Sequence, residues 1–402
     1  MKSEWIFLSA IASSRPCVFS CVFSQYCAIQ RSRANADLLS SRRFPLKPFT
    51  HLAMPGRVVH GAGRVSELAD EIALLGAERV MFCCTESRVP EVEILAATLG
   101  DRFAGICDAA KIFVPLTAVE PGRKMAEDLN ADCLVSFGGG TAVGLAKAIA
   151  LEKGQPIISI VTTFSGSETT ALQGIIGHDG VRTNHHDMRM LPRTLIYDPE
   201  LMLDLPLEVS VASGFNSISH AVSSYLGKDA NPVANMYSEN GIRTMSAALV
   251  RLAQDPRDIE ARSDAMHGAW LCGMTLMSSG TTIHHKIAHV LGGGFGLPHG
   301  PTHAVVLPHS TSYNRDEAPD AMAGIGRAFD VPPDHAPRAL FDLLRKSGAT
   351  ESLKGLGLPE LALEEAADRI MIDRYFNLRD YDRGAIRALL QDAWEGRPPS
   401  GV

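Results

Sequence analysis

The sequence predicts an α/β N-terminal domain with a parallel sheet, followed by an all-α C-terminal helical-bundle domain. From Arg57 to Tyr197, short β-branched runs alternate with amphipathic stretches, which is the rhythm of βαβ units. After Asp198 the chain changes to long Ala-, Leu- and Met-rich segments with helical spacing. A length of 402 residues suits two domains. We expect a leader over residues 1–46, the α/β domain over 47–200 and the helical domain over 201–402.

The α/β half is expected to alternate strands with helices in chain order. Apolar, β-branched runs predict strands over Arg57–His60, Arg79–Cys83, Asp132–Phe137 and Pro156–Val161, and the last strand signals end near Tyr197. Amphipathic spacing predicts the intervening helices over Val65–Leu75, Pro90–Leu99, Gly122–Leu129 and Ala142–Leu151. Strands joined through helices pair in parallel with right-handed crossovers.

The second half carries four segments with clear helical periodicity. They span Val209–Tyr225, Val233–Ala253, Asp258–Met277 and Ile283–Leu291. Together they predict a mainly α-helical domain.

Composition excludes several classes of protein. A net charge of −7 with 21% charged residues does not suit a polycation that neutralises phosphates, so we expect no nucleic-acid partner. The eight cysteines contain no CxxC pair, which favours a reducing compartment. After the leader, no segment offers about 18 uninterrupted apolar residues, so we expect no membrane span.

The leader differs from the rest of the chain. Trp5–Ile11 is apolar, but Glu4 does not suit the start of a secretory signal. The Arg- and Ser-rich, acid-poor stretch from Ser13 to Arg43 is typical of a mitochondrial transit peptide, and a disordered leader is the third interpretation. We expect a cytoplasmic protein, or a mitochondrial one if the leader is a transit peptide.

A glycine-rich turn is the first candidate site. Gly138, Gly139, Gly140 and Thr141 join a buried strand to a helix, where a backbone can approach a phosphate and helix N–H groups point at it. Lys147 lies two turns into that helix. The spacing is not GxGxxG, so a plain tight turn is the alternative.

A second polar turn favours the nucleotide interpretation. Thr162, Thr163, Ser165 and Ser167 follow the next strand, and neighbouring parallel strands bring such turns together at one sheet edge. Thr85 follows the strand over Arg79–Cys83, at the position where an acid would bind a ribose 2′-hydroxyl. Because threonine carries no charge, the choice between NADH and NADPH stays open.

Histidines gather in the helical half. Asn216 and His220 are spaced i, i+4, as are His285 and His289, and His299 follows in a Pro-His-Gly turn. His284 and His303 lie nearby in the sequence. Such spacing can build a metal site, but a carboxylate is missing because an amide stands at Asn216. The other interpretation is a set of pocket or core histidines.

These motifs resemble the iron-containing alcohol dehydrogenase superfamily, and most closely its maleylacetate reductase branch. The resemblance spans Phe49 to Pro398. The stretches that carry it are Gly138–Thr141, Thr162–Glu168, Leu191–Pro199, Gly214–His220, Gly268–Trp270, His284–His289, Pro298–Gly300, His303–His309 and Ile386–Gly396.

The resemblance implies a dinucleotide-binding domain, a homodimer and a substrate class. Members of this branch use NADH or NADPH to reduce the conjugated C=C of maleylacetate, a small dicarboxylate from hydroxyquinol or chlorocatechol breakdown, to 3-oxoadipate. The superfamily's metal ligands fall on Asn216, His220, His285 and His299. Because Asn216 replaces the usual Asp, we expect no obligatory iron or zinc.

The expected chemistry places negative charge on a ketone oxygen as an enolate forms, so the protein has to stabilise that charge. We expect protonated histidine or lysine to do this, with His285 and His289 as the electrophilic and proton-donating pair and His220 and His299 assisting. Lys286 and Arg182 are candidates to bind the dicarboxylate.

Four alternatives stay open at this point. The chain can be a metal-dependent alcohol dehydrogenase, a hydroxyacid-oxoacid transhydrogenase, a dehydroquinate-synthase-like lyase or a non-catalytic nucleotide sensor. Asn216 disfavours the first two, and the cost of burying so many polar rings disfavours the last.

Overall fold

The computed structural model describes residues 49, 51 and 56–399. Contacts separate Met1–Phe49 from Thr50–Val402, and the second of these is a single compact unit. The predictions made for the leader over residues 1–46 lie outside the described residues.

A six-stranded sheet forms the centre of the N-terminal half, and all its neighbouring strands are parallel. This confirms the predicted fold class. The spatial order is β1 (Arg57–His60), β8 (Thr194–Tyr197), β5 (Ile157–Val161), β4 (Cys133–Gly138), β2 (Val80–Cys83) and β3 (Phe103–Cys107).

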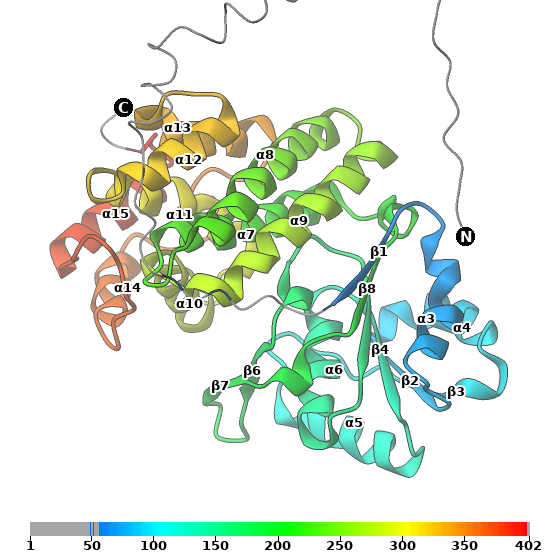
Figure 1. Cartoon of the computed structure of the whole chain (residues 1–402). Coiled ribbons are helices and arrows are strands. Elements are labelled where there is room, and N and C mark those ends of the chain that lie inside the picture. Colours follow the sequence, from blue (N-terminus) through cyan, green and yellow to red (C-terminus); the bar gives the residue numbers. More distant parts are fainter. Residues whose placement is uncertain (1–48, 50, 52–55, 400–402) are drawn as a thin grey trace, which may run out of the picture. The chain divides into compact units, whose positions relative to one another are not determined.

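Helices cover both faces of this sheet, because alternate residues of each buried strand point to opposite sides (Figure 1). Val80 and Phe82 pack with α3 (Leu68–Leu74) and α4 (Val89–Ala97). Met81 and Cys83 pack with α5 (Leu116–Asp128) and α6 (Gly140–Lys153) on the other face.

Three features of this half were not predicted. The edge strand β3 is partly exposed, and it contains Gly105, a residue that is depleted in strands and weakens the strand signal. The antiparallel hairpin of β6 (Leu172–Ile176) and β7 (Arg182–His186) ends in a polar, mostly exposed strand. Helix α5 begins before Pro121 and Gly122, two residues that usually mark a helix boundary.

In the described part of the C-terminal half, all the regular secondary structure is helical. The four predicted segments correspond to α7 (Leu207–Leu226), α8 (Pro232–Gln254), α9 (Ile259–Ser279) and α10 (Ile283–Phe295). Five further helices follow: α11 (His299–Tyr313), α12 (Pro319–Phe329), α13 (Ala336–Lys346), α14 (Ala362–Ile370) and α15 (Arg383–Glu395). No helix in the described part of the chain is long and apolar enough to cross a membrane.

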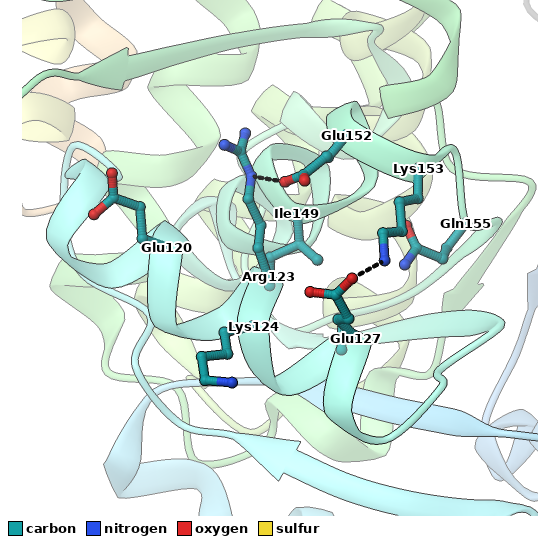
Figure 2. A pocket seen from close by; sticks show the side chains of 9 residues that line it. Glu120, Arg123, Lys124, Glu127, Ile149, Glu152, Lys153 and Gln155 are labelled. Atoms are coloured by element: carbon teal, nitrogen blue, oxygen red, sulfur yellow. Dashed lines mark hydrogen bonds and ion pairs between the residues drawn. The ribbon is translucent and has the colours of Figure 1, made fainter.

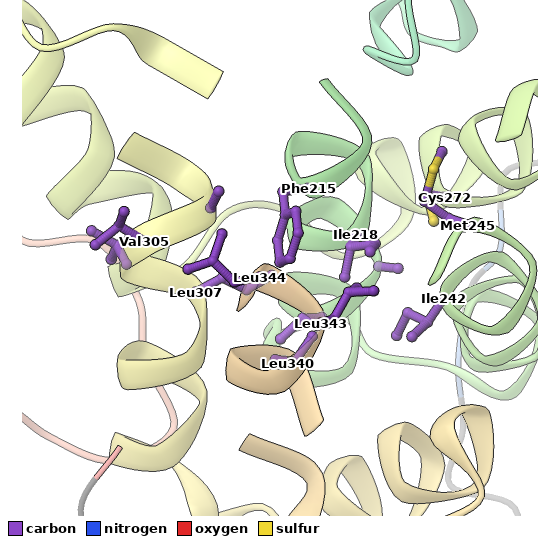
Figure 3. Close-up of a cluster of buried hydrophobic side chains, with 14 of the residues drawn as sticks. Phe215, Ile218, Ile242, Met245, Cys272, Val305, Leu307, Leu340, Leu343 and Leu344 are labelled. Atoms are coloured by element: carbon purple, nitrogen blue, oxygen red, sulfur yellow. The ribbon is translucent and has the colours of Figure 1, made fainter. Parts of the chain in front are cut away.

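One apolar core holds these helices together. Phe215 and Ile218 of α7 pack beside Met245 of α8 and Leu340 and Leu344 of α13 (Figure 3). The same cluster reaches the sheet through Phe164, which follows β5. Helix α7 is hydrogen-bonded to the same segment: Ser217 Oγ donates to the Phe164 carbonyl at 2.6 Å.

Candidate active site

The glycine-rich turn leaves room only for backbone. Strand β4 ends at Gly138, which has φ +145°, and α6 begins at Gly140. A Cβ at Gly139 would lie 2.6 Å from the Thr163 side chain. The 14-residue helix α6 starts here, with Thr141 in its first helical turn. A glycine-rich loop at a helix N-terminus lets the backbone and its N–H groups approach a phosphate, as binding of a dinucleotide pyrophosphate requires.

The second polar turn lies against the first. The Thr162 N–H donates to the Gly138 carbonyl at 3.0 Å. A Cβ at Gly140 would lie 3.2 Å from Ser167 Oγ and 3.6 Å from Ser165 Oγ, and those two hydroxyls are 3.1 Å apart. The two turns predicted to share one sheet edge are therefore neighbours there.

Thr85 lies at the same edge, two residues after the end of β2, which pairs with β4. Its hydroxyl is 3.1 Å from Ser87 Oγ. The position is therefore polar but uncharged, as the sequence indicates.

Lys147 supports the second turn from inside the protein. Its fully buried Nζ donates to the Ser167 carbonyl at 2.6 Å, to Thr170 Oγ1 at 3.0 Å and to the Leu172 carbonyl at 3.2 Å. Burial lowers the pKa of Lys147 to about 7, although the nearby Glu168 opposes this shift. The lysine predicted to bind the cofactor thus contacts the turn that carries Ser167.

Glu168 is a functional candidate that sequence analysis did not assign. The buried carboxylate accepts from the Tyr197 hydroxyl at 2.7 Å and from Ser165 Oγ at 3.3 Å. Burial raises its pKa. Only the fold brings Tyr197, at the end of β8, next to this turn.

Six imidazoles meet where three helices converge. Neighbouring ring centroids within the cluster lie between 4.4 Å (His299 and His303) and 6.3 Å (His289 and His299) apart. The histidine cluster consists of His220 from α7, His284, His285 and His289 from α10, and His299 and His303 from α11.

Asn216 connects this cluster to the second polar turn. Its Nδ2 donates to the Ser165 carbonyl at 3.2 Å and lies 3.3 Å from His220 Nε2. The predicted cofactor turn and the predicted histidine site therefore adjoin each other through a single side chain.

Hydrogen bonds join most of the rings. His220 Nδ1 lies 3.2 Å from His285 Nε2, and His285 Nδ1 lies 3.1 Å from Ser223 Oγ. Behind them, His284 Nε2 lies 2.8 Å from His303 Nδ1. Four of the six rings are thus hydrogen-bonded in two pairs within an apolar helical core.

Burial favours the neutral form of the four rings that lie inside the helical half, His220, His284, His285 and His303. Desolvation, followed by the charges of neighbouring rings, lowers the pKa of His220 to about 4 and that of His284 to about 3. Burial and the nearby positive charge of Arg182 lower the pKa of His289 to about 3. This geometry favours neutral imidazoles over the protonated histidine expected from the sequence, and it leaves Arg182 and Lys286 as the cations near the cluster.

Tyr375 completes the site and carried no signal in the sequence. It lies between α14 and α15, with its hydroxyl 3.3 Å from His289 Nδ1. Lys286 Nζ lies 5.5 Å from the centroid of the Tyr375 ring. A lone tyrosine in an irregular segment has no pattern to mark it, so only the fold identifies it.

The side chains around Asn216 do not form a metal-binding set. Among the described residues, no group of three or more His, Cys, Asp or Glu side chains is arranged to hold a metal ion. The Asn216 amide turns its NH₂ group towards His220 Nε2, while its Oδ1 is buried without a hydrogen-bond partner. We therefore derive no chemical step through a metal.

A separate cavity of about 290 Å³ lies on the surface of the α/β half, between α5 and α6 (Figure 2). Ion pairs line it, including Arg123–Glu152 at 3.3 Å and Lys153–Glu127 at 2.9 Å. Gln155, which precedes β5, places it at the amino edge of the sheet, opposite the two polar turns. It is not part of the candidate active site.

Comparison with known families matches both halves of the chain. Residues 55–199 match the iron-containing alcohol dehydrogenase family, and residues 210–394 match the C-terminal domain of the Fe-containing alcohol dehydrogenase family.

Similar individual proteins cover nearly the same part of the chain. The maleylacetate reductase of Burkholderia cepacia is 46% identical over 344 residues, which are 86% of this chain and 97% of that protein. The maleylacetate reductase of Pseudomonas knackmussii is 40% identical over 352 residues, covering 88% and 99%. The crystal structure of maleylacetate reductase from Agrobacterium tumefaciens superposes with a TM-score of 0.85 at 39% identity, covering 88% of this chain and all of that one.

Proposed function

The chain belongs to the iron-containing alcohol dehydrogenase family, and we propose that it is an NADH- or NADPH-dependent maleylacetate reductase that reduces the conjugated C=C of maleylacetate to 3-oxoadipate. One structural observation supports this proposal independently of the similarity to known reductases. The second polar turn is hydrogen-bonded, through Asn216, to the histidine cluster, which has two cations nearby.

The cofactor part of the proposal uses the two polar turns. Backbone N–H groups and hydroxyls are assigned to the pyrophosphate and the adjoining ribose, and Lys147 holds the second turn in place. The nicotinamide supplies the hydride. The assigned residues are Thr85, Gly138, Gly139, Gly140, Thr141, Thr162, Thr163, Ser165 and Ser167.

The substrate part of the proposal uses the histidine cluster. Hydride addition to an enone leaves negative charge on the ketone oxygen, which N–H donors and cations stabilise. His289 is partly exposed and, among the described residues, its hydrogen-bond partner is Tyr375, so we assign this neutral ring the role of N–H donor to the ketone oxygen as negative charge develops there. His299, on the same ring stack, assists it, while His220 and His285 support them from the buried side.

Two positive side chains suit a dicarboxylate. Arg182 on β7 is close enough for its charge to lower the pKa of His289 and His299, and Lys286 lies one helical turn from His289. Arg182 also packs over Gly174 of β6, where a Cβ would overlap its guanidinium group. Carboxylates bind such cations through charge-assisted hydrogen bonds.

A steady-state assay tests the function. We expect stoichiometric oxidation of NADH or NADPH with maleylacetate, 3-oxoadipate as the product, and full activity after treatment with a chelator. Turnover of simple alcohols or aldehydes that is lost on chelation would support the metal-dependent dehydrogenase instead. Tight NADH binding without any turnover would support the nucleotide sensor. A homodimeric assembly and a cytoplasmic location are part of the proposal, and light scattering and cell fractionation test them.

A further inference from the structure

We propose that Asn216 is a positioning residue that heads a one-way hydrogen-bond chain through His220 and His285 and fixes both rings as Nδ1–H tautomers. These hydrogen bonds occupy the Nε2 lone pairs of His220 and His285, two of the positions on which the family's metal ligands fall. The inference concerns the same site as the proposed function, but its evidence and its test do not depend on the substrate.

The direction of the chain is set at its first link. The Ser165 carbonyl carries no hydrogen, so the Asn216 group that faces it at 3.2 Å has to be the NH₂ group. The same nitrogen lies 3.3 Å from His220 Nε2. An amide nitrogen donates and does not accept, so this contact makes His220 Nε2 the acceptor. The competing arrangement, in which a His220 ring N–H donates to the Ser165 carbonyl, is the one that the tautomer spectra described below distinguish.

The remaining links follow from the chemistry of imidazole. A neutral ring has one N–H, so the His220 proton lies on Nδ1 and points at His285 Nε2, 3.2 Å away. His285 Nε2 is then an acceptor, and its own proton lies on Nδ1, 3.1 Å from Ser223 Oγ. Both histidines are at most 7% exposed, which favours the neutral form that this reasoning requires.

This arrangement is incompatible with using these rings as metal ligands. A metal requires a free lone pair on each imidazole. Here the Nε2 lone pair of His220 accepts from Asn216, and that of His285 accepts from His220. The centroids of these two rings lie 5.3 Å apart, and their planes are nearly parallel, with an angle of 15°.

An aspartate at position 216 would replace the hydrogen-bond donor that faces His220 Nε2 with an acceptor. A carboxylate only accepts hydrogen bonds, so it cannot donate to His220 Nε2 and it faces the Ser165 carbonyl unfavourably. The Nε2 lone pair of His220 would be released, and an anionic ligand would stand beside it. A single amide therefore determines whether these side chains form a hydrogen-bond chain or a metal site.

The test measures metal binding on purified, metal-stripped protein without substrate. Wild type and Asn216→Asp are titrated with Co²⁺, and binding is followed by visible absorption and by metal content after dialysis. We expect Asn216→Asp to bind one Co²⁺ per subunit, at least roughly tenfold tighter than wild type, the size of effect seen for changes around metal ligands. Asn235→Asp is the matched control, because it adds a carboxylate to α8, outside the site, and should leave Co²⁺ affinity at the wild-type level.

Two results would overturn the inference. One is wild-type protein that binds Co²⁺ as tightly as Asn216→Asp. The other is a folded Asn216→Asp variant, shown by circular dichroism and thermal unfolding, that gains no affinity.

A second measurement needs no variant to fold. Long-range ¹H–¹⁵N correlation spectra of ¹⁵N-histidine-labelled wild type should show His220 and His285 as Nδ1–H tautomers, and Nε2–H tautomers would contradict the chain. Failure of wild type to reduce maleylacetate would refute the proposed function but would leave both of these results unaffected.

Discussion

Tyr375 shows how one hydroxyl can determine the behaviour of a neighbouring imidazole. Of the six rings in the histidine cluster, His289 combines partial exposure with a single hydrogen bond, and Tyr375 provides that bond. A neutral imidazole donates from one nitrogen and accepts at the other, so a partner on Nδ1 also sets the state of Nε2.

We therefore expect Tyr375→Phe to lower kcat for maleylacetate by roughly tenfold or more, because His289 loses the group that fixes its orientation. Stopped-flow and steady-state assays of NADH oxidation measure this change. Tyr237→Phe, in α8 and outside the site, should leave kcat at the wild-type level. Equal kcat values for wild type and Tyr375→Phe would show that the Tyr375 hydroxyl has no role in the reaction.

Thr85 offers a second prediction at the scale of one residue. An acid at the end of the second strand of such folds binds the ribose 2′-hydroxyl and repels a 2′-phosphate. Thr85→Asp should therefore reduce kcat/KM for NADPH at least tenfold, a barrier increase of about 1.4 kcal/mol, while kcat/KM for NADH changes little. Thr98→Asp, at the C-terminal end of α4, is the control. A parallel loss with both cofactors would show that Thr85 does not lie near the 2′ position.

The candidate site could be predicted only in part at this scale. Helical spacing placed Asn216 and His220 on one face of a helix, and it did the same for His285 and His289. Their roles stay predictions. Tyr375 and Glu168 were missed because their partners, His289 and Tyr197, are far away in the sequence.

At the scale of elements, the buried strands could be predicted, and of the partly exposed strands only β1 (Arg57–His60) was. Strands β4 and β5 are buried along their whole length, and they appear in the sequence as mainly apolar runs, each with one serine. Strand β3 and the β6–β7 hairpin are partly exposed and contain glycine or polar residues, so backbone pairing stabilises them more than side-chain pattern does.

The turn between β4 and α6 gives the prediction for this scale. Because a Cβ at Gly139 would lie 2.6 Å from Thr163, Gly139→Ala should push the two polar turns apart. We expect at least roughly tenfold weaker NADH binding, a loss of about 1.4 kcal/mol, measured by fluorescence titration. Gly293→Ala is the control, since a Cβ there meets nothing within 4 Å. Unchanged affinity for NADH in folded Gly139→Ala would show that the cofactor does not use this turn.

At the scale of the whole molecule, the buried histidines make stability depend on pH. His309 in α11 is 4% exposed, and burial lowers its pKa from 6.5 to about 4. The folded protein therefore binds this proton less readily than the unfolded chain. Between pH 6.5 and pH 4 the unfolded state holds more protons, so the free energy of unfolding rises with pH. The stabilisation that depends on neutral His309 is present above pH 6.5 and is lost as the pH falls towards 4.

His309→Gln should flatten this dependence, because it removes one group that takes up a proton on unfolding. Each such proton contributes about 1.4 kcal/mol per pH unit, so the loss of stability between pH 6.5 and 5 should shrink by about 2 kcal/mol relative to wild type. Urea denaturation at a series of pH values measures it. Asn240→Gln, on an exposed side chain of α8, removes no titrating group and should retain the wild-type slope. If His309→Gln lost stability as steeply as wild type, His309 would have to be protonated in the folded protein as readily as in the unfolded chain.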